Sequence, residues 1–135
     1  MTEAEILRAY RTIAVVGLSN DRTRDSHSVS QYMQAAGYRV VPVNPEETEV
    51  LGEKAYRDLA SVPEPVEIVD IFRRPEYVPA IVDEAIAIGA KVIWMQQGIV
   101  NEEAAARAHA AGLEVVMDRC IRTEHRRMLA TNEGC

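Results

Sequence analysis

A continuous apolar run at residues 13–16 leads directly into Gly17, and this junction constrains the fold more than any other stretch of the chain. The run is rich in β-branched residues and predicts a strand that is covered on both faces. Gly17 allows a sharp turn with no Cβ between the main chain and a ligand. Ser19 and Asn20 follow, and a helical pattern predicts a helix over residues 28–36. A strand, a glycine turn and a helix N-terminus form an anion site, so we expect a phosphate here.

Strand-like and helical segments alternate five times along the chain, which predicts a parallel sheet with helices on both faces. We therefore expect one Rossmann-like, doubly wound α/β domain over residues 1–135 with a five-stranded sheet. The last stretch is charged, and Ile121, Met128 and Leu129 are its expected apolar anchors. The predicted strands span residues 13–16, 38–43, 66–72, 91–95 and 113–117, and the predicted helices span residues 3–11, 28–36, 75–88 and 102–111.

The strand ends are the places to look for a ligand, because open α/β sheets bind ligands outside the carboxyl ends of their strands. Two features of these ends disfavour a nicotinamide dinucleotide. Gly17 stands alone, without the Gly-x-Gly-x-x-Gly pattern of dinucleotide-binding turns. The second strand ends in Asn44 and Pro45 rather than in an acid that would bind a ribose hydroxyl. Another adenine nucleotide, with its phosphates held differently, stays open.

Charge narrows the class of ligand. The chain has 15 Lys and Arg against 21 Asp and Glu, a net charge of −6, which argues against a nucleic-acid partner. Arginines nevertheless gather after two strand ends, as Arg22 with Arg24 and as Arg73 with Arg74, and arginine suits forked phosphate contacts. A genome biased toward arginine gives the same count. No apolar run approaches the roughly 20 residues of a membrane span, and the acidic N-terminus is unlike a secretory signal. We expect a cytoplasmic protein.

Five segments together resemble the small CoA-binding proteins that are related to the N-terminal CoA-binding domain of succinyl-CoA synthetase α subunits. The resemblance spans nearly the whole chain and identifies coenzyme A as the expected cofactor. The synthetase also has a second domain with a phosphorylated histidine, which this chain lacks, so ligase activity is not expected. The matching segments are residues 13–19 (IAVVGLS), 37–45 (GYRVVPVNP), 70–75 (DIFRRP), 94–99 (WMQQGI) and 118–121 (DRCI) with Glu124 and His125.

The resemblance implies a role for each strand end. Residues at the glycine turn would hold the pyrophosphate, those after the second strand would flank the adenosine, those after the third would sit beside the adenine and a phosphate, and those after the fourth would lie along the pantetheine. CoA also carries a 3′-phosphate, which needs separate cations such as the arginines above. The candidate cofactor-binding residues are Gly17, Leu18, Ser19, Asn20, Arg24, Ser28, Asn44, Pro45, Phe72, Arg73, Arg74, Gln97 and Gly98.

Each candidate also has a structural interpretation. Gly17 could be a plain turn glycine, Arg73 and Arg74 could be solvated, and Phe72, the one phenylalanine, could belong to the core. Neighbouring Gln96 and Gln97 could be ordinary loop residues, and a strand that alternates to its end lets only one of them point into the cleft.

Cys120 is the candidate thiol-reactive residue. A free cysteine is most often inert and buried, but this one lies at a strand end on the ligand side, and CoA ends in a thiol. Arg119 and Arg122 could lower its pKa, so we hypothesise a mixed disulfide between Cys120 and CoA. Cys135 is the other cysteine, and no spacing of cysteines or histidines indicates a metal site. His125 is interpreted as a structural hydrogen-bonding residue.

We therefore expect a protein that binds CoA or an acyl-CoA without catalysis of its own. The alternatives are a redox or acyl-transfer enzyme that uses Cys120, a nicotinamide-dependent oxidoreductase, and a regulatory module that reports CoA status to a partner. Apolar residues of the terminal segment could support a homodimer or another protein partner.

Overall fold

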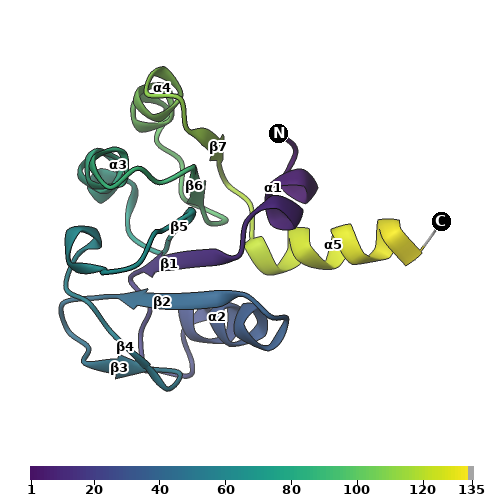
Figure 1. Ribbon diagram of the computed structural model, residues 1–135, viewed down its shortest axis with the longest axis horizontal. Coiled ribbons are helices and arrows are strands. Elements are labelled where there is room, and N and C mark those ends of the chain that lie inside the picture. The colour runs from purple at the N-terminus through teal and green to yellow at the C-terminus, as the bar shows by residue number, and fades with distance from the viewer. Residues whose placement is uncertain (134–135) are drawn as a thin grey trace.

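The computed structural model describes residues 1–133, and its centre is a parallel sheet with strand order β2-β1-β5-β6-β7. Figure 1 shows the sheet with helices on both sides. The predicted doubly wound α/β fold with five parallel strands is confirmed. The elements are α1 (Glu3–Ala9), β1 (Thr12–Val16), α2 (Asp25–Ala35), β2 (Arg39–Val43), β3 (Glu49–Val50), β4 (Glu53–Lys54), η1 (Leu59–Ser61), β5 (Ile68–Ile71), η2 (Pro75–Tyr77), α3 (Val78–Ala87), β6 (Val92–Met95), α4 (Glu102–Ala110), β7 (Glu114–Val116) and α5 (Ile121–Glu133).

The strand order creates a topological switch point beside β1. Strand β1 pairs with β2 on one side, where Ile13 faces Val40, and with β5 on the other, where Ile13 faces Ile68. The chain therefore leaves β1 toward one edge of the sheet and later returns to build β5, β6 and β7 toward the other edge. In such sheets the crevice at the reversal is the usual ligand site.

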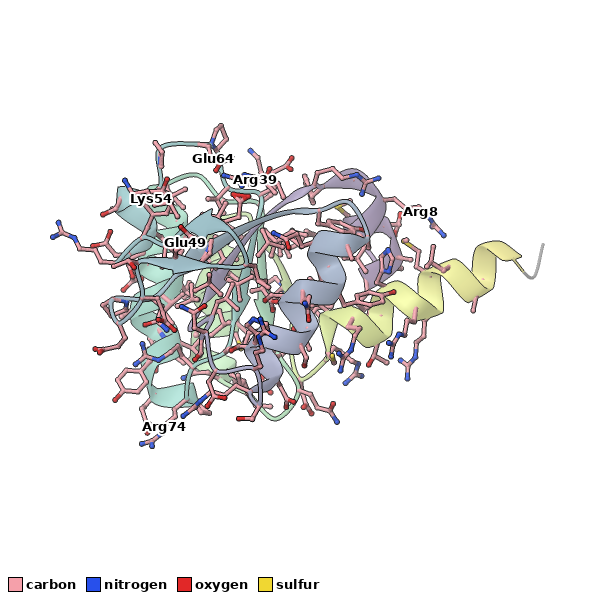
Figure 2. All side chains as sticks on the ribbon, turned by 90° about the horizontal axis from the view of Figure 1, so that it is seen from below. Arg8, Arg39, Glu49, Lys54, Glu64 and Arg74 are labelled. Atoms are coloured by element: carbon pink, nitrogen blue, oxygen red, sulfur yellow. The ribbon has the colours of Figure 1, made fainter. Side chains whose placement is uncertain are left out.

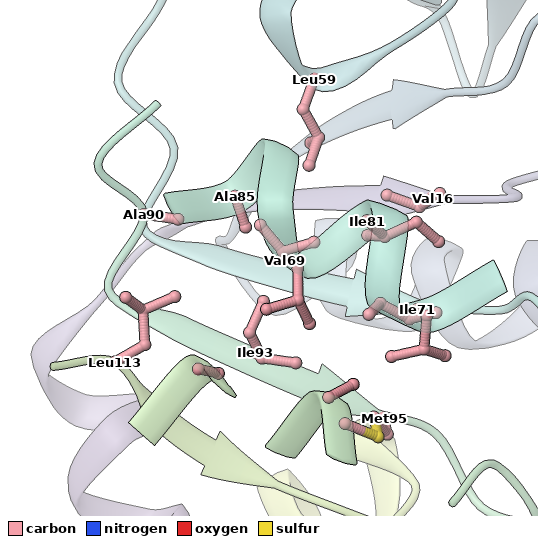
Figure 3. Close-up of a cluster of buried hydrophobic side chains, with 14 of the residues drawn as sticks. Val16, Leu59, Val69, Ile71, Ile81, Ala85, Ala90, Ile93, Met95 and Leu113 are labelled. Carbon is pink, nitrogen blue, oxygen red and sulfur yellow. The ribbon is translucent and has the colours of Figure 1, made fainter. Parts of the chain in front are cut away.

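Alternation along the strands produces two buried layers. On β5, Val69 and Ile71 point to the face that is covered by α3 and α4, as the cluster in Figure 3 shows. Ile68 lies on the other face, where α1, α2 and α5 supply the covering side chains. Asp70, two residues along the same strand, shares that second face and is 1% exposed. A buried carboxyl group thus interrupts an otherwise apolar layer.

Helix starts follow the predicted caps in two places and differ in one. Thr2 and Glu5 form the expected capping box of α1, and Asn101 accepts from the amide of Ala104 at the start of α4. Helix α2, however, begins at Asp25 and not at Ser28. Ser26 and His27 are buried polar residues, so an apolar periodicity does not detect this first turn.

The terminal segment forms a helix, α5, that the apolar pattern did not predict. Ile121 and Met128 are buried as expected, but Leu129 is 41% exposed, so the prediction that it anchors the segment is wrong. Two polar residues of the same helix, Glu124 and His125, are buried instead. The hydroxyl of Tyr32 on α2 lies 2.7 Å from Nδ1 of His125, which confirms the structural role expected for this histidine.

Within residues 1–133, every helix is too short or too polar to cross a lipid bilayer.

Candidate functional site

A cleft of about 590 Å³ lies at the carboxyl ends of β1, β2 and β5, which is the switch point of the sheet. Figure 2 labels Arg74 at this end and the ion pair of Arg39 with Glu64 at the opposite edge, where β2 begins. We call this space the switch-point cleft. Its lining residues are Gly17, Ser19, Arg24, Asn44, Pro45, Glu46, Glu47, Phe72, Arg73, Arg74 and Tyr77.

Gly17 is required by packing as well as by conformation. Its φ is +95°, in the region that favours glycine, and a Cβ at this position would lie 2.5 Å from the carbonyl oxygen of Phe72. The amide of Gly17 donates to the carbonyl of Val43 at 2.8 Å, and the amide of Phe72 donates to the carbonyl of Val16 at 2.9 Å. The glycine turn is therefore held directly against the loop that follows β5.

The amides beyond Gly17 already have acceptors inside the protein. Ser19 donates its amide to the hydroxyl of Ser26 at 3.2 Å, and Asn20 donates its amide to the Glu47 carboxylate at 2.6 Å. The Asn20 side chain donates to the same carboxylate at 3.1 Å and to the carbonyl of Glu49 at 2.7 Å. A carboxylate thus occupies the place at the turn where we expected a phosphate.

Asn44 connects this turn to the loop after β2. Its side-chain amide donates to the carbonyl of Leu18 at 3.0 Å, and its side-chain oxygen accepts from the amide of Glu46 at 2.9 Å. The two hydrogen bonds of this side chain therefore connect the glycine turn to the loop after β2 and fix the shape of the cleft between them. Pro45 lines the cleft beside it.

Three arginines bring positive charge to the cleft. Arg24 is exposed and lies 3.7 Å from Asp21. The guanidinium of Arg73 lies 4.4 Å from the centre of the Tyr77 ring, a cation–π contact, and Arg74 is exposed. Among residues 1–133, no carboxylate lies within ion-pairing distance of Arg73 or Arg74. These two cations are therefore available to an anion that enters the cleft.

A second space, which we call the Cys120 cavity, measures about 210 Å³ and opens where α5 begins. Phe72 lines it as well as the switch-point cleft. Gln96 is buried, and its side-chain oxygen accepts from the amide of Ile121 at 3.1 Å, whereas Gln97 is exposed. The lining residues are Asp25, Val29, Phe72, Gln96, Gln97, Ile99, Cys120, Arg122 and Thr123.

Four candidate residues line neither of these spaces. The Leu18 side chain is fully buried. Asn20 is held by the acidic loop, as described above, and the Ser28 hydroxyl donates to the carbonyl of Asp25 at 3.4 Å. Gly98 donates its amide to the Asp118 carboxylate at 2.7 Å. These residues shape the surrounding loops in the structure.

The sequence interpretation missed Glu46, Glu47 and Tyr77, which line the cleft. The two glutamates follow Asn44 and Pro45 directly, but an acid was sought only at the strand end itself. Tyr77 lies within the predicted helix of residues 75–88, and the apolar periodicity of that helix does not include it among the buried positions.

Comparisons with known proteins show the family of this chain. A family model described as a CoA binding domain matches residues 11–126. This chain belongs to the CoA-binding domain family. It is 47% identical to YneT of Bacillus subtilis (strain 168) over 121 residues, which is 90% of each protein. A hypothetical protein from Pyrococcus horikoshii OT3 has a solved structure that matches with a TM-score of 0.91 and 42% identity, covering 96% of this chain and 93% of that one.

Homology also extends to a larger enzyme. The chain is 30% identical over 122 residues to the alpha subunit of acetate–CoA ligase (ADP-forming) II from Pyrococcus furiosus, and the match covers 82% of this chain. It spans 27% of that subunit's length, so the CoA-binding domain is the shared part.

Proposed function

We propose that this protein binds coenzyme A or an acyl-CoA in the switch-point cleft and carries out no chemistry in that cleft by itself. One observation carries the proposal: Arg73 and Arg74 line the same cleft as Gly17 of the glycine turn, and neither has a carboxylate partner within residues 1–133. Membership of the CoA-binding domain family supports it. A volume of about 590 Å³ is within the range of small-molecule sites.

The charges of CoA suit this arrangement. CoA carries a diphosphate and a separate 3′-phosphate, and two guanidiniums provide forked donors for phosphate oxygens. The pantetheine arm extends away from the nucleotide part of CoA. We propose that this arm runs past Phe72 toward Gln97. Phe72 supports this path because it lines both the cleft and the Cys120 cavity.

The Glu47 carboxylate is the internal competitor of the ligand. It accepts from the Asn20 amide at 2.6 Å, so a phosphate that binds at this turn has to displace it. A loop that carries Glu46 and Glu47 also repels a second negative charge nearby. The ligand's phosphates are therefore expected to lie toward the arginine side of the cleft.

Titration calorimetry with CoA, acetyl-CoA, dephospho-CoA, ATP and NAD tests the proposal. CoA and acetyl-CoA should bind, and dephospho-CoA should bind more weakly because it lacks the 3′-phosphate. Arg73→Ala and Arg74→Ala should each weaken CoA binding by about 1–3 kcal/mol, the usual value of a charge-assisted hydrogen bond. Arg126→Ala is the matched control, since Arg126 is exposed on α5 over the ring of Tyr32 and outside the cleft.

Two results would reject the proposal: no heat with CoA in the wild-type protein, or CoA affinity that neither arginine variant changes. Equal binding of CoA and dephospho-CoA would reject only the assignment of a guanidinium to the 3′-phosphate.

A nicotinamide dinucleotide is the second candidate, and Glu46 and Glu47 favour it. They bring carboxylates into the cleft shortly after β2, the region from which dinucleotide-binding folds bind a ribose hydroxyl. Binding of NAD that is tighter than that of CoA in the same calorimetric series would favour this candidate.

A further inference from the structure

A buried histidine joins the C-terminal helix to the rest of the protein. His125 of α5 is 6% exposed, and its Nδ1 atom lies 2.7 Å from the hydroxyl of Tyr32 on α2, 93 positions away in the sequence. The rings of Tyr32 and Tyr38 make edge-to-face contacts with the imidazole, with ring centres 5.4 Å and 5.6 Å away. The Tyr38 hydroxyl in turn donates to the carbonyl of Leu7 on α1 at 2.7 Å. This cluster therefore links α1, α2 and α5.

Two cations lie beside the rings that contact His125. Arg11, in the segment between α1 and β1, places its guanidinium 5.1 Å from the centre of the Tyr38 ring. Arg126, the next residue of α5, places its guanidinium 5.0 Å from the centre of the Tyr32 ring. A proton on the imidazole would therefore add a third positive charge to a buried cluster, and burial opposes a charge.

No counter-ion balances such a proton. Within residues 1–133, no carboxylate lies within ion-pairing distance of His125. Glu124 precedes it in α5 and is buried, but its carboxylate accepts from Arg127 at 2.9 Å. The titratable and charged groups of this layer are Arg8, Tyr10 and Arg11 from α1 and the segment after it, Tyr32 from α2, Tyr38 before β2, Asp70 from β5, and Cys120, Glu124, Arg126 and Arg127 from α5 and the residue before it.

The proton affinity of the imidazole follows from these surroundings. Burial, together with the charge of Arg11, lowers the pKa of His125. The folded protein therefore binds this proton less readily than the unfolded chain does. The stability that the neutral ring contributes is complete above the ordinary histidine range and is lost as pH falls through that range.

Helix α5 also forms a wall of the Cys120 cavity. Arg122 and Thr123, in its first turn, line that cavity, and the amide of Ile121 donates to the buried side-chain oxygen of Gln96 at 3.1 Å. Figure 1 shows that α5 begins beside α1 and then extends away from the sheet toward the C-terminus. The first turns of α5 thus pack on the protein and also reach a space beside the candidate site.

We propose that His125 is a pH-sensitive clasp that holds residues 121–128 of α5 against α1 and α2 and opens in mildly acidic solution. In the closed clasp, the neutral imidazole carries its hydrogen on Nε2 and accepts the Tyr32 hydroxyl at Nδ1. Protonation puts a hydrogen on Nδ1, so this hydroxyl can no longer donate there. It also adds a charge without a counter-ion beside Arg11 and Arg126. The helix then loosens, and the cavity wall that it forms changes.

This inference goes beyond CoA binding and does not rest on it. Every measurement of the test is made on the full chain without a ligand. Calorimetry with CoA, measured separately, reports whether the proposed binding function has failed on its own.

Nuclear magnetic resonance titration of the three histidines tests the clasp. His125 should titrate at a lower pH than His109, which is exposed on α4. Hydrogen exchange, corrected for the intrinsic effect of pH on exchange, should show that the protection of residues 121–128 falls as His125 is protonated. The amides of β1 should keep their protection over the same range. The amide signals of Arg122 and Thr123 should shift with the midpoint of His125.

Residue-resolved measurements are needed because two buried groups act in opposite directions. Burial raises the pKa of the Asp70 carboxyl, so its protonation in acid favours the folded state while protonation of His125 disfavours it. Denaturation of the whole protein reports only the sum of these two effects.

Tyr32→Phe keeps the ring but removes the hydroxyl that donates to the neutral imidazole. His125 should then titrate at a higher pH, closer to that of His109. Tyr56→Phe is the matched control, because Tyr56 follows β4, where Lys54 lies over its ring, and it should leave the titration of His125 unchanged. His125→Phe should abolish the pH dependence of protection in α5.

The proposal is overturned if His125 titrates at or above the pH of His109, or if the protection of residues 121–128 does not follow its titration. A Tyr32→Phe variant in which His125 titrates at the same or a lower pH would also overturn it. If a variant does not fold, titration and exchange of the unmutated chain decide the question by themselves. Amide signals of Arg122 and Thr123 that ignore the His125 midpoint would reject the effect on the cavity wall.

Discussion

The switch-point cleft and the Cys120 cavity both open at the carboxyl ends of the strands, and Phe72 lines both, but they treat charge differently. In the cleft, neither Arg73 nor Arg74 has a carboxylate partner among the described residues: Arg74 is exposed, and the half-buried Arg73 lies over the ring of Tyr77. Beside the cavity, Cys120 is half-buried, and Asp70 lies buried in the sheet with an Oδ1 atom that has no hydrogen-bond partner among the described residues. The cleft therefore presents cations at its surface, whereas the sheet beside the cavity buries a carboxyl group whose pKa is raised by that burial.

The largest expected effect is a loss of folding stability on substitution of Gly17, which lies in the switch-point cleft and not in the Cys120 cavity. In Gly17→Ala, the left-handed backbone and the 2.5 Å approach to the Phe72 carbonyl both oppose the new Cβ. Strain and overpacking together should lower the free energy of unfolding by about 3–5 kcal/mol. Urea denaturation measures this loss.

Gly112 provides the matched control for that substitution. Its φ is +89°, but no atom lies within 4 Å of a Cβ placed there. Gly112→Ala should therefore lose only the cost of the left-handed conformation, about 1–2 kcal/mol. Equal losses in the two variants would show that the Phe72 contact adds nothing.

A smaller effect, a gain in affinity for CoA, is expected from substitution of Glu47. Glu47→Gln removes the charge that competes for the Asn20 amide, so CoA should bind about fivefold more tightly, or about 1 kcal/mol. Glu46→Gln removes a charge from the same cleft without breaking that hydrogen bond, and it should improve affinity less. Calorimetry that finds Glu47→Gln no tighter than Glu46→Gln would contradict the role of Glu47 as competitor.

The last expected effect is a change, in an Asp70 variant, in how the free energy of unfolding depends on pH. Because the pKa of Asp70 is raised in the folded state, the folded protein keeps a proton that the unfolded chain loses, and stability falls as pH rises above the ordinary carboxyl range. In acid both states are protonated, so the penalty vanishes there. Asp70→Asn should thus gain stability relative to the wild type from acid to neutral pH.

Chemical denaturation at several pH values measures this slope. The free energy of unfolding of Ser30→Ala should depend on pH in the same way as that of the wild type, since a hydroxyl does not titrate in this range. A stability difference between Asp70→Asn and the wild type that is constant with pH would mean that Asp70 titrates normally.

The sequence predicted the sheet because its strands are buried on both faces and read as apolar runs between glycines. It did not predict α5, because the positions of α5 that face the protein include the polar Glu124 and His125 as well as Ile121 and Met128. Apolar spacing does not detect a helix whose buried face is half polar. The start of α2 was misplaced for the same reason.

The site was predictable where it follows the strand ends and less so where it depends on side-chain partners. Arg73, Arg74 and Pro45 lie in the cleft because they follow parallel strands. Asn20 and Leu18 also follow a strand, but hydrogen bonds and burial direct them into the protein. Asp70 Oδ1 has no hydrogen-bond partner among the described residues because of the groups that surround it in the folded protein. A local sequence pattern does not specify these groups.

The contact between Gly17 and the Phe72 carbonyl has an evolutionary consequence. Any descendant of this fold that keeps the two loops together has to keep a residue without a side chain at position 17, whatever it binds. Selection for folding alone preserves the glycine after a ligand has been lost. Among relatives, the arginines after β5 are therefore the better markers of retained binding.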